Sequence, residues 1–83
     1  MKDIVIAGAV RTAIGSHGGG LRSQRAQDLA EIVFRAVFER TGLDPADLDE
    51  VILGNIAQPS DAANIGRVAA LMAGVPIEVP GFT

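Results

Sequence analysis

Glycines that could cradle a phosphate follow the first apolar run of the sequence. Gly15 and residues 18–20 come shortly after the apolar residues 4–7, and a glycine-rich loop after a strand is a common setting for a nucleotide site. A P-loop needs Gly-x-x-x-x-Gly-Lys-Ser/Thr, because its lysine must reach the terminal phosphates. Gly8 and Gly15 are too far apart for that motif, and no lysine follows them. The dinucleotide fingerprint Gly-x-Gly-x-x-Gly is not in register with a helix start either. We therefore interpret residues 15–20 as a surface loop.

The remaining polar residues form no recognisable catalytic or metal site. His17 is the only histidine; it could act as a base or a ligand, but no further ligands stand near it in the sequence, so we expect it to be exposed on a loop. The carboxylates within residues 44–50 could do acid–base work, yet they flank a short turn and indicate a solvated connection. None of the serines sits in a Gly-x-Ser-x-Gly elbow. The sequence predicts no catalytic, cofactor-binding or metal-ligating residue.

The composition excludes several classes of protein. The 83 residues include no cysteine, which excludes a disulfide framework, a Cys-ligated zinc and a cysteine nucleophile within them. The net charge of −3 and the scattered cations argue against a nucleic-acid or anionic-membrane surface. No apolar run approaches the ~20 residues of a membrane helix. Residues 1–3 lead straight into an apolar run, unlike a secretory signal, and we expect a cytoplasmic protein.

The chain carries much apolar material for its size. For 8.6 kDa, area scaling predicts roughly 4,700 Å² of accessible surface in the folded state and about 60% of the unfolded surface buried. Yet 48% of the residues are hydrophobic and the mean hydropathy is +0.32. This excess favours a chain that buries surface against another polypeptide.

The order of elements predicts an α/β fold with a mostly parallel sheet and helices on both faces. Strands are expected at residues 4–7 and 51–53, because both are continuous apolar runs typical of buried strands. Residues 79–83 resemble the beginning of a third strand. A helix is expected over about residues 23–41, ended by Gly42. Asp44 and Pro45 predict an N-cap and the first position of one helical turn.

The first predicted helix is apolar round most of its circumference. Leu29, Ile32, Val33, Ala36 and Val37 share one face, which further apolar residues, including both phenylalanines, widen. A polar stripe remains, in which Glu31 and Arg35 stand at the favourable i,i+4 spacing. The phenylalanines either pack on neighbouring loops or face a partner surface that the chain lacks, and we favour the second.

The second predicted helix has two apolar faces. It begins with Ser60 or Asp61 as the N-cap and ends near Ala73, before Gly74. One face carries larger apolar side chains, and the other carries only small residues, among them Gly66. Glycine inside a helix costs about 1 kcal/mol relative to alanine. Either a neighbouring element packs closely at Gly66, or the glycine is simply tolerated near the helix start.

The succession of these segments resembles that of thiolases, the acyl-CoA C-acyltransferases. Residues 4–15 resemble the family's first strand running into Arg-Thr-(Pro or Ala)-x-Gly, here Arg11-Thr12-Ala13-Ile14-Gly15. Residues 27–30, 49–55 and 64–71 also match in order and spacing, and residues 79–83 resemble the approach to the nucleophile segment. Arg11-Thr12 and the Gly54-Asn55 turn carry most of the weight.

The resemblance implies the βαβαβ portion of a thiolase N-terminal half. Thiolases cleave 3-ketoacyl-CoA with CoA, or condense two acyl-CoA units, through a thioester on a cysteine at a helix N-terminus, which favours the thiolate. CoA and acyl-CoA are then substrates, with no covalently bound cofactor. The family's cysteine lies a few residues beyond the position of Thr83, so residues 1–83 form an incomplete domain that ends before it, and no catalytic residue can be carried over.

Two hypotheses follow from the resemblance. The chain is the N-terminal part of a thiolase whose companion polypeptide carries the catalytic residues, in a homo- or hetero-oligomer; alternatively, it is a non-catalytic α/β binding or assembly module. Under the first hypothesis an unpaired strand edge invites pairing, and we expect residues 79–83 and the loop 55–64 to lie near a subunit interface. The residues assigned to that interface are Asn55, Gln58, Asn64, Arg67, Val79, Phe82 and Thr83.

Overall fold

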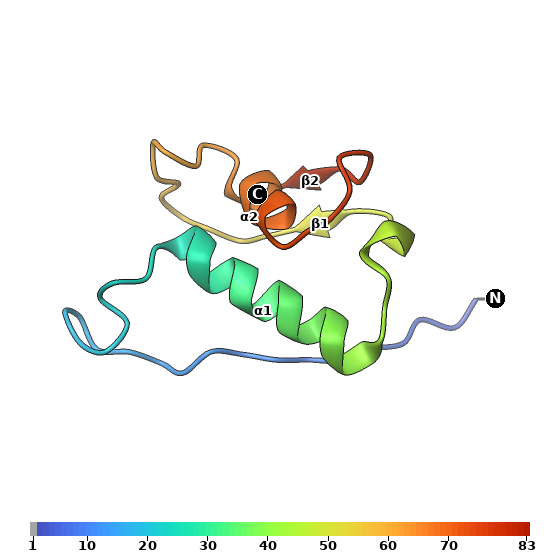
Figure 1. Cartoon of the computed structure of the whole chain (residues 1–83), viewed down its shortest axis with the longest axis horizontal. Helices are drawn as coiled ribbons and strands as arrows, with labels where there is room; N and C mark the ends of the chain where they lie inside the picture. The colour runs from blue at the N-terminus through green and yellow to red at the C-terminus, as the bar shows by residue number, and fades with distance from the viewer. Residues whose placement is uncertain (1) are drawn as a thin grey trace.

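The computed structural model describes residues 2–83, which contain two helices, one short 3-10 turn and two short strands (Figure 1). Helix α1 spans Ala26–Thr41 and helix α2 spans Ile65–Met72. Strand β1 (Val51–Ile52) pairs in parallel with β2 (Gly81–Phe82), in the register Val51 to Gly81 and Ile52 to Phe82. The α/β class and the parallel pairing predicted from the sequence are confirmed. No helix of the described residues is long and apolar enough to cross a bilayer.

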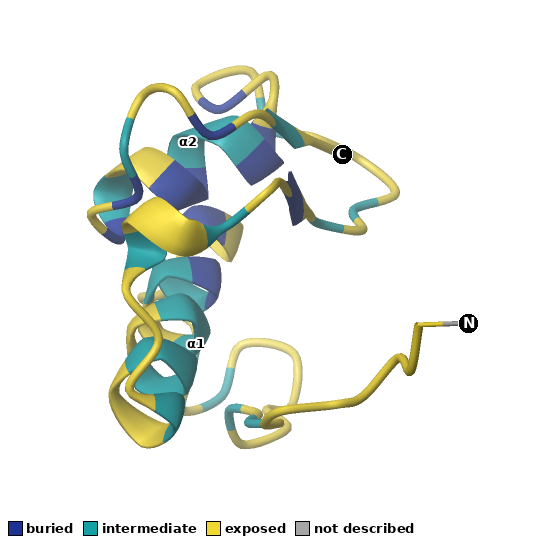
Figure 2. Ribbon diagram, turned by 90° about the vertical axis from the view of Figure 1, so that its right-hand side faces the viewer, coloured by how far each residue is buried: buried dark blue, intermediate teal, exposed yellow. Residues whose placement is uncertain are grey.

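The buried core lies between α2, the two strands and one face of α1. Val51, Ala70, Val75 and Val79 form its centre, and Phe34, Phe38 and Leu48 pack against it. Figure 2 shows the buried residues gathered round α2, while most of α1 stays only half-buried. The phenylalanines of α1 therefore reach the core of their own chain, contrary to the partner surface favoured from the sequence, and Ala30 is the one apolar residue of this helix that is buried.

The predicted strand at residues 4–7 is not a strand in the described chain. The segment is extended but has no ladder partner, and Ile4 and Ile6 are more than nine-tenths exposed. It lies apart from β1 and β2 in both views (Figures 1 and 2). The residues that follow it run beside α1, where Arg40 Nη1 donates to the Ala9 carbonyl at 3.0 Å and a Cβ on Gly8 would approach Thr41 Cγ2 to 2.6 Å. A strand needs a neighbour as well as apolar residues, and none lies beside this segment.

The ends of α1 follow from local chemistry. Gly42 closes the helix in the left-handed conformation, at φ 71°, as the sequence predicts. The start lies three residues later than expected, at Ala26. There the Asp28 carboxylate accepts hydrogen bonds from the backbone N–H and the guanidinium of Arg25, at 2.9 to 3.0 Å. Asp28 therefore fixes the first turn.

Those hydrogen bonds make the first turn of α1 dependent on pH. Hydrogen bonding to the Arg25 side chain and backbone lowers the pKa of Asp28 below its ordinary value. A depressed carboxyl pKa stabilises the folded turn above the unfolded-state pKa of about 4, and this stabilisation is lost as the pH falls through the lowered value. We expect the NMR titration of the Asp28 carboxyl carbon to lie below that of a short peptide. In Asp28→Asn, fraying of the first turn should lose this component of its pH dependence, whereas an ordinary titration of Asp28 would contradict the assignment.

Candidate functional site

Most of the polar residues singled out in the sequence lie apart from one another and exposed. His17 is exposed on its loop, and the side chains of Asp44, Asp47, Asp49 and Glu50 are exposed around the 3-10 turn Pro45–Asp47. Asp44 Oδ1 accepts from the Ala46 N–H at 3.0 Å, so it caps that turn as predicted. No group of His, Asp or Glu able to hold a metal ion is found among residues 2–83. The glycine-rich loop is mostly exposed.

A polar network instead surrounds the first turn of α2. Three side chains accept hydrogen bonds from its first backbone N–H groups, which have no partners inside the helix. Gln58 Oε1 accepts from Ile65 at 3.1 Å, Thr83 Oγ1 accepts from Gly66 at 3.0 Å, and Asn64 Oδ1 accepts from Arg67 at 3.3 Å. The start of α2 is thus saturated from three places in the chain.

The N-cap of α2 is Asn64, and the prediction of Ser60 or Asp61 is wrong. Residues 59–64 form turns, so the helix begins later than expected. Asn64 is also tied to the strand, because its Nδ2 donates to the Gly81 carbonyl at 3.2 Å. Among the candidate caps, only Asn64 both caps the helix and bonds β2. Its partner in β2, Gly81, is distant in the sequence.

The small-residue face of α2 is a close-packing face. A Cβ on Gly66 would lie 2.5 Å from the Phe82 carbonyl oxygen, and one on Gly81 would lie 3.3 Å from Arg67 Cα. Of the two interpretations left open by the sequence, close approach is the one observed. Helix α2 and strand β2 are therefore in backbone contact near residues 66 and 81–82.

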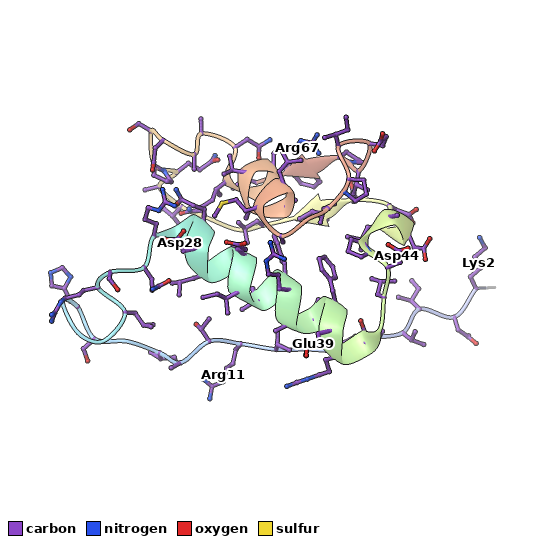
Figure 3. The ribbon with its side chains drawn as sticks, viewed as in Figure 1. Lys2, Arg11, Asp28, Glu39, Asp44 and Arg67 are labelled. Atoms are coloured by element: carbon purple, nitrogen blue, oxygen red, sulfur yellow. The ribbon has the colours of Figure 1, made fainter. Side chains whose placement is uncertain are left out.

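Arg67 holds the turn that leads into β2. Its guanidinium donates to the Val79 carbonyl at 2.6 Å and to the Ile77 carbonyl at 2.8 Å. Figure 3 shows Arg67 on the side of α2 that faces the β2 segment. The side chain therefore ties residues 77–79 to the helix.

The residues assigned to a subunit interface fall into three places. Gln58, Asn64, Arg67 and Thr83 belong to the network at the start of α2, and Phe82 lies beside it with its side chain half exposed. Val79 is buried in the core of its own chain. Asn55 lies elsewhere, with Thr12, Leu53 and residues of α1, in an open groove of about 330 Å³. The interface itself stays a prediction.

This arrangement can position a chain but carries no reacting group of its own. The hydrogen bonds of the network join uncharged side chains to backbone groups or to one another, and the charged guanidinium of Arg67 donates only to backbone carbonyls. No local pattern in the sequence indicates the capping roles of Gln58 and Thr83, because each lies outside the helix that it caps. What the network fixes is the direction of the backbone at residues 81–83.

Comparison with known proteins finds similarity to one family along the chain. Residues 4–83 match the model of the thiolase N-terminal domain. The acetyl-CoA acetyltransferase of Pseudomonas aeruginosa is 45% identical over all 83 residues, and a probable acetyl-CoA acyltransferase of Staphylococcus aureus is 41% identical. The chain spans 21% of the length of each of these relatives.

Two solved structures share the fold. The acetyl-CoA acetyltransferase of Bacillus anthracis superposes with a TM-score of 0.90 and 46% identity, covering 95% of this chain and 20% of that one. The enzyme of the same name from Syntrophomonas wolfei gives a TM-score of 0.86 and 35% identity, covering 93% and 19%.

Proposed function

Because this chain belongs to the thiolase family, whose N-terminal domain it matches, we propose that it forms the N-terminal part of an acyl-CoA C-acyltransferase. The enzyme transfers an acyl group between acyl-CoA and CoA through a cysteine thioester, by thiolysis of a 3-ketoacyl-CoA or by formation of acetoacetyl-CoA. The observation that carries this proposal is the match to enzymes named acetyl-CoA acetyltransferase, at 45% identity over the entire chain and at 46% identity over 95% of it.

The catalytic groups are assigned to a companion polypeptide that carries the rest of the fold. These 83 residues include no cysteine, so the family's nucleophile cannot come from them. The chain itself contributes a scaffold of two parallel strands. The second of them, β2, leads toward the position where the family's nucleophile segment follows. CoA and acyl-CoA are substrates of the complete enzyme.

The surface of the chain supports a companion. Its accessible area is 6126 Å², against roughly 4,700 Å² expected for a compact protein of this mass. Ile4, Ile6 and Ile52 are largely exposed, and within residues 2–83 β1 has β2 as its single neighbour. Apolar surface and an unpaired strand edge of this kind favour association. We extend the proposal to a homo- or hetero-oligomer with Asn55 and the exposed residues around the start of α2 near its interface.

A chimera tests this function directly. The thiolase chimera consists of the full 83-residue chain joined to the part of the B. anthracis enzyme that lies beyond its matched fifth. We expect it to cleave acetoacetyl-CoA with CoA at a rate within about tenfold of the parent, since residues that only position the site are supplied by a relative of the same fold. The remaining B. anthracis fragment without this chain is the control, and it should be inactive.

The outcome separates the two hypotheses for this chain. A folded chimera without thiolysis, whose fragments still bind each other when mixed, would overturn the enzyme proposal and favour the non-catalytic binding or assembly module. Restoration of thiolysis by mixing the separate 83-residue chain with the fragment would support the companion arrangement as well as the activity.

A further inference from the structure

The backbone at residues 81–83 rests on the first turn of α2 through polar contacts. The Thr83 hydroxyl accepts from the Gly66 N–H at 3.0 Å and pairs with Asn64 Oδ1 at 3.0 Å. Asn64 Nδ2 donates to the Gly81 carbonyl at 3.2 Å. We call Thr83, Asn64 and the Gly66 amide the Thr83 latch. Figure 1 shows its place, with the C-terminal end beside α2.

Side-chain packing contributes little at this point of the chain. Phe82 is 48% exposed and Thr83 is exposed, so apolar burial does not fix how the backbone leaves β2. The Leu53 N–H also donates to the Phe82 carbonyl, at 3.0 Å, in the ladder between the two strands. Together with this ladder bond, the latch ties residues 81–83 to the rest of the chain.

The direction of each hydrogen bond in the latch is determined. The Gly66 N–H is a donor, so the Thr83 oxygen accepts from it and the hydroxyl hydrogen is left for the Asn64 oxygen. The same Asn64 oxygen accepts from the Arg67 N–H at 3.3 Å. A serine at position 83 preserves both bonds, whereas valine, which has nearly the same shape, preserves neither.

The latch also occupies the positive end of α2. Helix N–H groups at an open N-terminus attract anions, but those of residues 65–67 are taken by Gln58, Thr83 and Asn64. The first turn of α2 is therefore occupied by the chain itself and serves as its anchor.

We propose that Thr83 and Asn64 are positioning residues that set the direction in which the backbone leaves β2 and so place the segment that carries the nucleophile. This inference rests on the proposed thiolase function. It assigns neither residue a contact with substrate. Displacement of a reacting group by about 1 Å can cost up to about 100-fold in rate, so a hydrogen-bonded anchor a few residues away is able to control turnover.

The test compares Thr83→Val and Thr83→Ser in the thiolase chimera. We expect Thr83→Val to lower kcat by about 10–100-fold with KM for acetoacetyl-CoA within about twofold, and Thr83→Ser to keep at least half of kcat. A cysteine displaced from its helix N-terminus has a higher pKa, so the acidic limb of the kcat/KM pH profile should move to higher pH in Thr83→Val alone. Thr41→Val, which removes a hydroxyl bonded to the Val37 carbonyl inside α1, is the matched control.

Different failures have different meanings in this experiment. An inactive unsubstituted chimera refutes the proposed function. An active chimera in which Thr83→Val matches Thr83→Ser in kcat and in pH profile refutes the latch. If the valine variant does not fold, Thr83→Ala removes the hydroxyl without adding a methyl group and is held to the same expectation. A fall in thermal stability with an unmoved pH profile would reduce the latch to a structural contact and overturn its positioning role.

Discussion

Replacing Gly66 with alanine is expected to destabilise the thiolase chimera by about 1–3 kcal/mol, even though alanine is the better helix former by about 1 kcal/mol. The added Cβ would lie 2.5 Å from the Phe82 carbonyl oxygen and 3.0 Å from its carbon. Both are backbone atoms, which cannot swing aside as the end of a side chain can. Helix α2 and strand β2 must therefore separate, and the hydrogen bond from Gly66 to Thr83 is stretched with them.

The midpoint of thermal unfolding measures this effect, with Gly20→Ala as the control. A Cβ on Gly20 meets nothing within 4 Å and its backbone is not in the left-handed region, so the change should stay within about 0.5 kcal/mol. The Gly66 variant should also lose kcat, because the latch is displaced. A Gly66→Ala midpoint at or above that of the unsubstituted chimera would mean that helix propensity outweighs the close approach.

The parts of the fold that the sequence predicts correctly have both partners within a few residues. Gly42 ends α1 because glycine adopts the left-handed φ of 71° without strain, and no other residue has to move for it. Glu31 and Arg35 form the expected ion pair at 2.9 Å, one helical turn apart. The Asp44 carboxylate caps the N–H of Ala46, two residues along. In each case the residue types and their spacing already contain the whole interaction.

The start of α2 could not be predicted in the same way. Ser60, Asp61 and Asn64 are all good N-cap residues, and local preference does not rank them. The choice of Asn64 depends on Gly81 and Thr83, which lie 17 and 19 residues away. The caps supplied by Gln58 and Thr83 are likewise invisible until the strands pair. The candidate site is therefore a product of tertiary contacts, although the sequence already assigns four of its residues to one interface: Gln58, Asn64, Arg67 and Thr83.

Residues 4–7 show a different limit of sequence reasoning. Their apolar, β-branched composition correctly indicates an extended backbone (Figure 1), and it is Ala9, just after them, that is bonded to α1. Hydrogen-bonded pairing is a property of two segments, and the described chain places no second strand beside this one. Under the proposed function the missing neighbours belong to the companion polypeptide, and an exposed segment with the composition of a buried strand is what that proposal predicts.

Arg67→Met is expected to cost the thiolase chimera about 2–4 kcal/mol, since a hydrogen bond to a charged group contributes roughly 1.5–3 kcal/mol and the exposed bond to Ile77 contributes less than the part-buried bond to Val79. Methionine keeps much of the apolar stem but donates nothing, so the carbonyls of Val79 and Ile77 lose their partners at 2.6 and 2.8 Å. Val79 is buried, so its carbonyl is the harder one to hydrate. The loss should appear as a lower thermal midpoint and as faster proteolytic cleavage within residues 77–80.

Arg67→Lys distinguishes the contribution of the two diverging N–H donors of Arg67 from the contribution of its charge. Lysine at position 67 keeps the charge but presents a single ammonium in place of two diverging N–H donors, so Arg67→Lys should recover about half of the loss. Arg40→Met is the matched control, because Arg40 makes one exposed bond, to the Ala9 carbonyl; it should cost about 1 kcal/mol or less. If Arg67→Met cost no more than Arg40→Met, the turn before β2 would be held by the burial of Val75 and Val79 alone. The stabilising polar contacts would then be those of Asn64 and its partners, without those of Arg67 to the turn.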